Sequence, residues 1–147
     1  MKIHDLMNVN ATRIRAGASV RQAAEVLSGT QASDLMVVDD DNSFLGVLSE
    51  GDLIRAALPR YDEILSAGGG SLSDAFETFV DNGRALAGGS IASLVIRAAI
   101  TISPGEDVLK AAGTMISHQI RRLPVVADGK LVGTISRADI CRAVLGA

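Results

Sequence analysis

Two stretches of the chain carry the same motif: GVLSEGD at residues 46–52 and GTISRAD at residues 133–139. Both read glycine, any residue, a hydrophobic residue, serine, two variable residues and aspartate. Around them, a shift of 88 residues, reduced to 87 after one deletion, aligns residues 3–58 with residues 91–145 and gives 19 identical pairs. The chain therefore contains two homologous copies of about 55 residues, joined by an insert.

Each copy has the pattern of a mixed helix and strand unit. Apolar residues at helical spacing predict a helix that begins near Val20 in the first copy and near Val108 in the second. Asp128 and Gly129, which both tolerate positive φ, predict a hairpin turn. Each copy is predicted to be β-α-β-β-α after a short leading helix, with first strands over 11–15 and 99–103, hairpins over 34–39 with 44–49 and over 122–127 with 130–136, and final helices that end at Leu58 and Leu145.

We predict an α+β fold (α/β-like), with repeat 1 at residues 1–58, an insert at 59–90 and repeat 2 at 91–147. A small sheet with helices on one side leaves an apolar face uncovered, so the repeats are expected to pack about a pseudo-two-fold axis with clefts between them. The insert contains a predicted amphipathic helix that starts after Ser71 or Ser73, between predicted hinge glycines at 68–70 and 88–89. This helix packs on the body or on a dimer mate, or serves as a lid or partner-docking helix.

Composition excludes several kinds of partner. The 147 residues carry a net charge of −3 and a pI of about 5.3, which argues against binding to nucleic acid or to an anionic membrane. The longest apolar run, residues 91–100, is interrupted by Arg97 and is too short to span a bilayer. The single cysteine, Cys141, excludes an intrachain disulfide, favours a reducing, cytoplasmic location and is expected to be buried.

The repeated motif has two interpretations. A serine followed three residues later by an acidic residue is typical of a helix N-terminal capping box. Alternatively, a strand that turns directly into a helix gathers backbone N–H groups, a hydroxyl and a carboxylate; the first two suit a phosphate and the carboxylate suits the hydroxyls of a ribose. The glycine that precedes the serine by three residues allows a ligand or a backbone to approach the strand.

The repeated unit, its closing motif and the stretch IRRLPVV at residues 120–126 resemble the cystathionine-β-synthase (CBS) domain, as a tandem pair. The resemblance implies that adenosine-containing ligands bind in the cleft between the copies, with Asp52 and Asp139 on the ribose and Ser49 and Ser136 beside the phosphate. It implies a disc-like homodimer and a regulatory role toward an unknown effector protein. It also implies an adenine slot beside the first strand of each copy, with aliphatic residues near the hairpin, and the candidates there are Asn10, Ala11, Thr12, Ala98, Ala99 and Ile100. Pro124 is a further candidate for ligand binding.

The two copies differ in the basic residues that a phosphate would need. Arg121 and Arg122 supply fork-shaped donors, whereas the matching residues of the first copy are Ser33 and Asp34. We therefore predict two unequal sites, and the sequence leaves open which aspartate lies near the arginine pair.

Three functions remain. The first is a stand-alone regulatory module that needs no cofactor, binds AMP, ADP, ATP or S-adenosylmethionine, and signals to a partner by conformational change. The second is a ligand-free structural or protein-interaction module in which the motif is only a cap. The third is an enzyme. The sequence offers no activated nucleophile, metal cluster or acid–base pair to support it, so we assign no catalytic and no metal-binding residue.

Overall fold

The computed structural model describes residues 1–60, 62 and 71–146, so the predicted hinge glycines at 68–70 lie outside the described residues. The chain forms two compact units. Unit 1 consists of residues 1–15, 36–47 and 96–147, and unit 2 consists of residues 16–35 and 48–95. Each unit therefore contains residues from both sequence copies.

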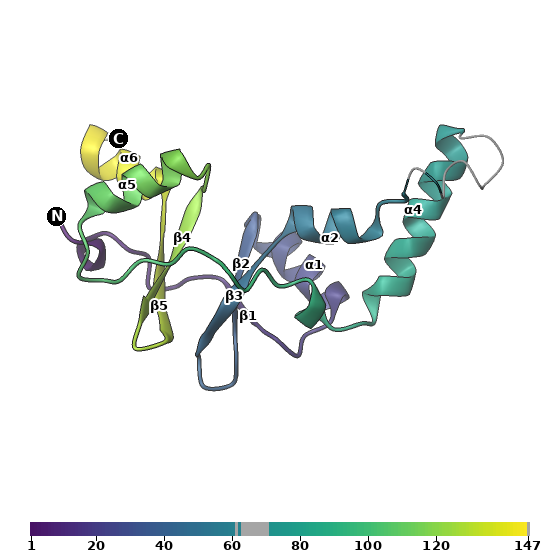
Figure 1. Cartoon of the computed structure of the whole chain (residues 1–147), viewed down its shortest axis with the longest axis horizontal. Coiled ribbons are helices and arrows are strands. Elements are labelled where there is room, and N and C mark those ends of the chain that lie inside the picture. Colours follow the sequence, from purple (N-terminus) through teal and green to yellow (C-terminus); the bar gives the residue numbers. More distant parts are fainter. Residues whose placement is uncertain (61, 63–70, 147) are drawn as a thin grey trace. The chain divides into compact units, whose positions relative to one another are not determined.

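The first copy has the predicted order of elements (Figure 1): β1 (Arg13–Arg15), α1 (Val20–Thr30), β2 (Asp34–Val38), β3 (Phe44–Ser49) and α2 (Glu50–Ala57). The sheet order is β1-β2-β3, and β1 runs parallel to β2 with Ile14 opposite Val37. Ser19 is the N-cap of α1, and its hydroxyl accepts a hydrogen bond from the Gln22 N–H at 3.1 Å. The predicted leading helix is only one 3₁₀ turn, η1 (Ile3–Asp5).

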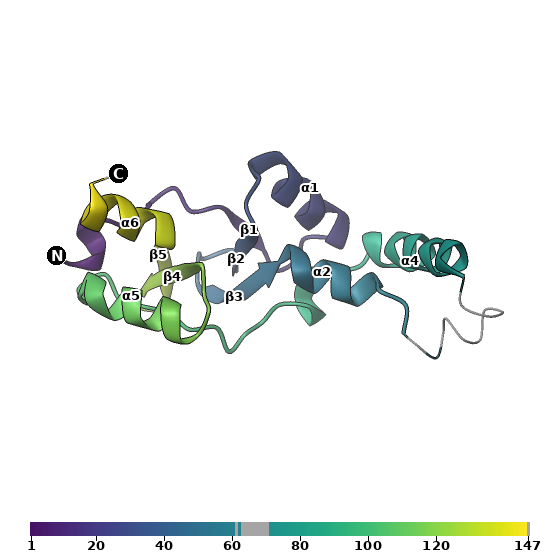
Figure 2. The same ribbon diagram turned by 90° about the horizontal axis from the view of Figure 1, so that it is seen from above.

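The second copy contains η2 (Ile91–Ser93), α5 (Val108–Ser117), β4 (Arg122–Ala127), β5 (Lys130–Ser136) and α6 (Arg137–Leu145). The predicted hairpin is confirmed: β4 and β5 are antiparallel, and their turn places Asp128 at φ 51° and Gly129 at φ 76°. Figure 2 shows α5 and α6 beside this hairpin, where α5 contacts β4 and α6 contacts β5.

The prediction of a strand over residues 99–103 is wrong: only a single β-bridge forms there, at Ile102. Ile102 pairs with Val125, donating to the Pro124 carbonyl at 3.1 Å and accepting from the Val126 N–H at 2.9 Å. Proline has no N–H to donate to the Ile100 carbonyl, so the ladder stops there. In the first copy Met36 stands at the proline position, and its N–H reaches the Thr12 carbonyl at 3.2 Å.

The leading segment of each copy packs on the other copy. Residues 1–8 join the second copy: the Ile3 N–H donates to the Glu106 carbonyl at 2.9 Å, and Asn8 and Thr134 exchange backbone hydrogen bonds of 2.7 and 3.0 Å. The segment that follows η2 joins the first copy, where Ile96 and Val47 exchange the equivalent pair of backbone hydrogen bonds, of 2.8 and 3.1 Å. The two copies thus exchange their leading segments: the segment that precedes each copy packs on the other one.

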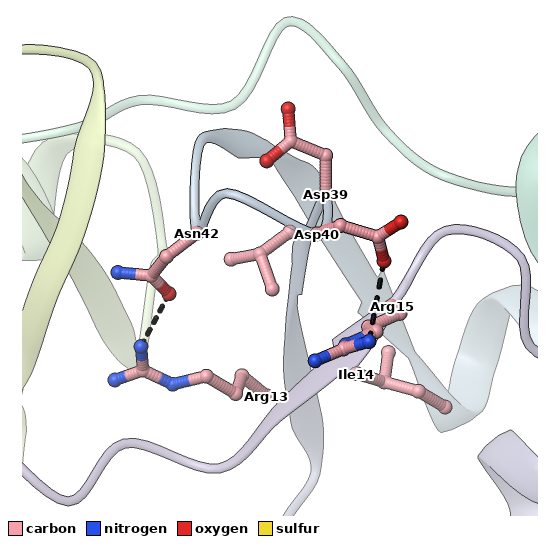
Figure 3. Close-up of a pocket in the computed structure, with 7 residues that line it drawn as sticks. Arg13, Ile14, Arg15, Asp39, Asp40 and Asn42 are labelled. Atoms are coloured by element: carbon pink, nitrogen blue, oxygen red, sulfur yellow. Dashed lines mark hydrogen bonds and ion pairs between the residues drawn. The ribbon is translucent and has the colours of Figure 1, made fainter.

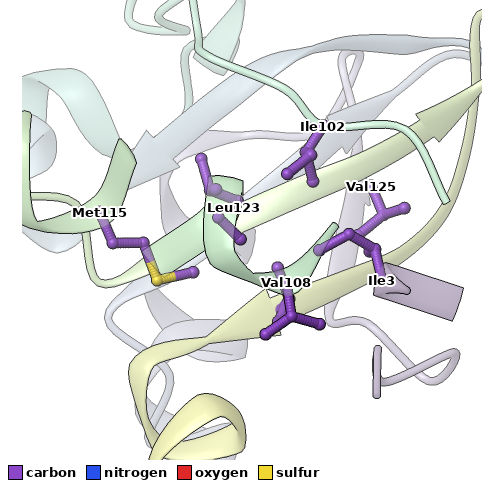
Figure 4. Packing of buried hydrophobic residues seen from close by; sticks show 8 residues of the cluster. Ile3, Ile102, Val108, Met115, Leu123 and Val125 are labelled. Atoms are coloured by element: carbon purple, nitrogen blue, oxygen red, sulfur yellow. The ribbon is translucent and has the colours of Figure 1, made fainter. Parts of the chain in front are cut away.

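Figure 4 shows the core that this exchange completes in unit 1. Ile3 is fully buried among side chains of α5, β4 and β5, and Ile102 lies in the same cluster. The members of the cluster are Ile3, Ile102, Val108, Ala111, Met115, Leu123, Val125 and Ile135.

Replacing Ile3 with alanine is expected to lower the free energy of unfolding by about 2–5 kcal/mol, because it leaves a cavity in this core. Chemical denaturation measures the change. Leu72→Ala, at a side chain that is 89% exposed, is the matched control and should change stability by less than about 0.5 kcal/mol. Equal effects of the two substitutions would contradict the exchanged packing.

Among the described residues of unit 2, the helices α1, α2 and α4 (Leu72–Ala87) contact one another. The predicted helix of the insert is confirmed, and of its two candidate caps Ser71 is the one used, accepting from the Asp74 N–H at 3.1 Å. The apolar stripe of α4 is partly exposed to solvent, since Phe76 is 63% exposed.

In unit 1, Cys141 is exposed on α6, so its predicted burial is wrong. No helix among the described residues is long and apolar enough to cross a membrane.

Candidate functional site

The first motif forms a complete capping box at the start of α2. The Ser49 hydroxyl accepts from the Asp52 N–H at 3.2 Å, and the Asp52 Oδ2 accepts from the Ser49 N–H at 2.8 Å and from its hydroxyl at 3.0 Å. The other carboxylate oxygen, Oδ1, accepts from Arg55 Nη2 at 2.6 Å. Both oxygens of Asp52 are therefore engaged within unit 2.

The second motif repeats the cap at the start of α6, so the capping interpretation is confirmed for both copies. The Ser136 hydroxyl accepts from the Asp139 N–H at 3.1 Å, and Asp139 Oδ2 accepts from the Ser136 N–H at 2.9 Å. Its Oδ1 lies 3.6 Å from Arg142 Nη1, which is 1.0 Å longer than the Asp52–Arg55 separation of 2.6 Å. The Asp139 carboxylate is thus held less tightly by its neighbouring arginine.

The arginine pair lies beside the second motif. Arg122 stands directly across the β4–β5 ladder from Ser136, and its Nη1 donates to the Thr134 hydroxyl at 3.4 Å. Arg121 is exposed, and its carbonyl accepts from the Arg137 N–H at the first turn of α6, at 3.0 Å. Unit 1 therefore places Arg122 opposite Ser136 and close to the start of α6, where Asp139 lies, and the backbone of Arg121 meets the same helix start.

The equivalent place in the first copy has no cation at the two matched positions. The Glu50 N–H donates to the Ser33 carbonyl at 3.2 Å, as Arg137 does to Arg121, and this shared bond shows that the two copies superpose residue by residue here. The Ser33 hydroxyl donates to Asp34 Oδ2 at 3.3 Å. A negative charge thus stands where Arg122 stands in the second copy.

The candidate adenine-slot residues all belong to unit 1. Asn10 is exposed and donates its N–H to Asn8 Oδ1 at 2.9 Å, while the Thr12 carbonyl is used by β2. Ile100 is 37% exposed, and its carbonyl faces the position at which Pro124 offers no N–H. The remaining candidates are half-buried Ala11 and Ala99, exposed Ala98 and buried Pro124.

Unit 1 therefore contains Arg121, Arg122, Ser136, Asp139 and the slot residues, whereas Ser49 and Asp52 belong to unit 2. Sequence reasoning missed Thr134, which is buried and holds both Arg122 and the backbone of Asn8. A threonine within a buried strand, one residue after a glycine, was the available signal. Within the described ranges, no three or more His, Cys, Asp or Glu side chains are grouped so as to hold a metal ion.

The family assignment agrees with this architecture. The family model of the CBS domain matches residues 3–59 and again residues 91–146. The chain therefore belongs to the CBS domain family and carries the domain as a tandem pair.

Similar proteins match almost the whole chain. An uncharacterized protein of Methanocaldococcus jannaschii, MJ1225, is 26% identical over 140 residues, which is 95% of this chain and 41% of that protein. The chloroplastic CBS domain-containing protein CBSX2 of Arabidopsis thaliana is 28% identical over 90% of this chain and 58% of its own length. The chain thus spans about half the length of these relatives.

The solved structure of CBSX2 in complex with AMP is similar to this chain with a TM-score of 0.74 and 25% identity, covering 99% of this chain and 96% of that one. This similarity confirms the predicted mixed helix and strand fold of a CBS pair.

Proposed function

We propose that this chain is a regulatory module that binds an adenosine-containing ligand, AMP, ADP, ATP or S-adenosylmethionine, and signals to a partner protein by a change of conformation. The observation that carries the proposal is the cluster at the start of α6, where Asp139, Ser136 and Arg122 lie together. A carboxylate accepts from ribose hydroxyls, and guanidinium groups bind phosphate. The AMP complex of CBSX2 supports the same ligand class.

The second copy supplies the stronger site in this proposal. Asp52 already accepts three hydrogen bonds, one of them from Arg55, so a ribose there must displace a charged partner. Asp139 has a longer contact to Arg142 and lies beside the arginine pair. The unequal sites expected from the basic residues are therefore also favoured by the geometry of the two carboxylates.

The output of the module is proposed to pass through a homodimer or another chain in the cytoplasm. Large apolar side chains remain exposed on α2 (Ile54), at the C-cap of α2 (Leu58) and on α6 (Val144 and Leu145). Such helix faces are typical of protein interfaces. Ligand binding shifts the balance between two arrangements only by the difference in its affinity for them.

Thermal melting of ligand-stripped protein tests the proposal, with AMP, ADP, ATP, S-adenosylmethionine and NAD each at millimolar concentration. A ligand present at 100 times its dissociation constant adds about 2.7 kcal/mol, which raises Tm by several degrees in a domain of this size. Asp139→Ala should abolish the shift measured against its own ligand-free melt. Asp52→Ala should weaken it less.

Either variant also loses the carboxylate half of its capping box while the serine cap remains, so the ligand response and not the absolute Tm is decisive. The competing function is a ligand-free interaction module, favoured by the exposed side chains of Leu72 and Phe76 on α4. Absence of any ligand-dependent shift would support that module, and the search would then turn to partners of α4. Steady nucleotide turnover by pure protein would instead indicate an enzyme.

A further inference from the structure

A pocket of about 270 Å³ opens on unit 1 beside β1, away from both repeated motifs. This pocket, here called the β1 pocket, is lined by Arg13, Ile14, Arg15, Val38, Asp39, Asp40 and Asn42. Ser49 and Asp52 belong to unit 2, and the pocket lies at the hairpin turn that precedes β3 rather than at the end of β3 where Ser49 stands. The pocket shares no lining residue with the proposed adenosine site, but it adjoins the slot candidates, because Arg13 follows Thr12 and its Nε donates to the Ala11 carbonyl at 3.5 Å.

Arg13 and Arg15 present two guanidinium groups to this pocket from one strand. Ile14 between them is buried, and because side chains alternate along a strand, its two neighbours lie on the opposite face. Figure 3 shows the Arg13 side chain directed to Asn42 and the Arg15 side chain directed to Asp40. Two forked donors two residues apart on a strand are suited to holding one anionic group between them.

The position of Arg13 is fixed by a chain of hydrogen bonds. Its Nη1 donates to Asn42 Oδ1 at 2.5 Å, and the Asn42 amide is oriented by donating to the Leu131 carbonyl at 2.8 Å. The Asn42 backbone, at φ 63°, also accepts from the Leu131 N–H. Arg13 is half-buried, so this guanidinium is partly removed from water and held in place. A guanidinium has five N–H donors, and a preset orientation lowers the cost of binding a ligand to the others.

The two aspartates of the β1 pocket, Asp39 and Asp40, determine which chemical groups a ligand needs besides an anionic one. Asp39 Oδ1 accepts from the N–H groups of Ser43, at 2.8 Å, and of Asp41, at 2.9 Å, and these bonds lower the pKa of Asp39, so it is ionised at neutral pH. Asp40 is highly exposed and pairs with Arg15 at 3.3 Å, a contact that an anion can replace at little cost. Ionised carboxylates accept hydrogen bonds and repel a bare anion, so they favour a ligand that also carries hydroxyl groups.

We propose that the β1 pocket binds a small phosphate monoester that carries hydroxyl groups, with the phosphate between Arg13 and Arg15 and a hydroxyl on Asp39 or Asp40. This site uses residues different from those of the proposed function and does not depend on it. Asn42 acts as a positioning residue for Arg13. Asp40 acts as the counter-ion that the phosphate displaces from Arg15.

The test is an amide chemical-shift titration of ¹⁵N-labelled full-length protein at fixed ionic strength, with glycerol 3-phosphate, inorganic phosphate and glycerol as separate probes. Glycerol 3-phosphate should shift the amides of residues 13–15 and 39–42 saturably and bind several-fold more tightly than inorganic phosphate, while glycerol should produce no such shift. Arg15→Gln should weaken glycerol 3-phosphate about tenfold or more, as expected for loss of a charge-assisted hydrogen bond. Arg21→Gln, an exposed arginine of α1, removes the same charge and should leave binding unchanged.

Asp40→Asn provides a gain-of-affinity arm, because it releases Arg15 and removes a repelling charge, so inorganic phosphate should bind a few-fold more tightly. Asp139→Ala should leave all of these shifts in place, which separates this pocket from the proposed nucleotide site. Three results would overturn the proposal: no saturable shift up to about 20 mM probe, equal loss in the Arg15 and Arg21 variants, or glycerol 3-phosphate binding no tighter than inorganic phosphate.

Discussion

Replacing Gly133 with alanine is expected to lower the free energy of unfolding by about 2–4 kcal/mol, through overpacking and lost hydrogen bonds. A Cβ at this position would lie 2.8 Å from the Asn8 carbonyl oxygen and 3.2 Å from Met7 Sδ. The first of these atoms is backbone and cannot rotate away, so the two hydrogen bonds between Asn8 and Thr134 must lengthen or break. Chemical denaturation measures the loss, and hydrogen exchange should show residues 3–8 unprotected.

Gly113→Ala is the matched control for this substitution. Gly113 lies inside α5, and a Cβ there meets no atom within 4 Å. Alanine is the better helix former by about 0.5–1 kcal/mol, so this variant should be more stable than the parent chain. The same chemical change is thus expected to act with opposite sign at the two glycines. Stabilisation by Gly133→Ala would contradict the close approach of the leading segment.

Replacing Arg121 and Arg122 together by glutamine is expected to weaken ATP binding about 100-fold, the equivalent of two charge-assisted hydrogen bonds. The loss should fall through ADP and AMP and should be within about threefold for adenosine, because only the phosphates need the guanidinium groups. Isothermal titration calorimetry gives the four affinities. This prediction depends on the proposed function and on the position of Arg122 beside Ser136.

A control double variant, Arg21→Gln with Arg84→Gln, removes the same two charges from exposed positions on α1 and α4. It should leave all four affinities within about twofold, because neither arginine is among the proposed ligand-binding residues and exposed charges are screened by salt. Equal losses for adenosine and ATP in the Arg121 and Arg122 variant would exclude a phosphate role for the pair.

Local structure could be predicted well from the sequence because its signals are local. The turn at Asp128 and Gly129 predicted β4 and β5 with the bounds that the structure has, and the repeated serine and aspartate predicted the caps of α2 and α6. The helix of the insert likewise starts after Ser71. Propensity, capping and turn geometry act over a few residues, so one sequence is enough to reveal them.

What the sequence could not predict depends on contacts between distant residues. Ile3 and Ile91 are aligned and chemically identical, so nothing in the chain says which copy's core each one enters. The shortened strand near Ile102 follows from the missing N–H of Pro124, which matters only once the register between them is known. The orientation of Arg13 by Asn42 joins residues 29 positions apart, and a carboxylate such as Asp52 or Asp139 shows its partners only in three dimensions.

The exchanged leading segment also constrains how the chain is made. Ile3 leaves the ribosome 132 positions before Ile135, which shares its core. At a synthesis rate of about 5–20 residues per second, the first copy waits on the order of ten seconds for the residues that complete unit 1. During that interval the core that buries Ile3 is incomplete. The core of unit 1 therefore closes only after Ile135 has been translated, so its folding depends on long-range contacts and is not the stepwise folding of one repeat after the other.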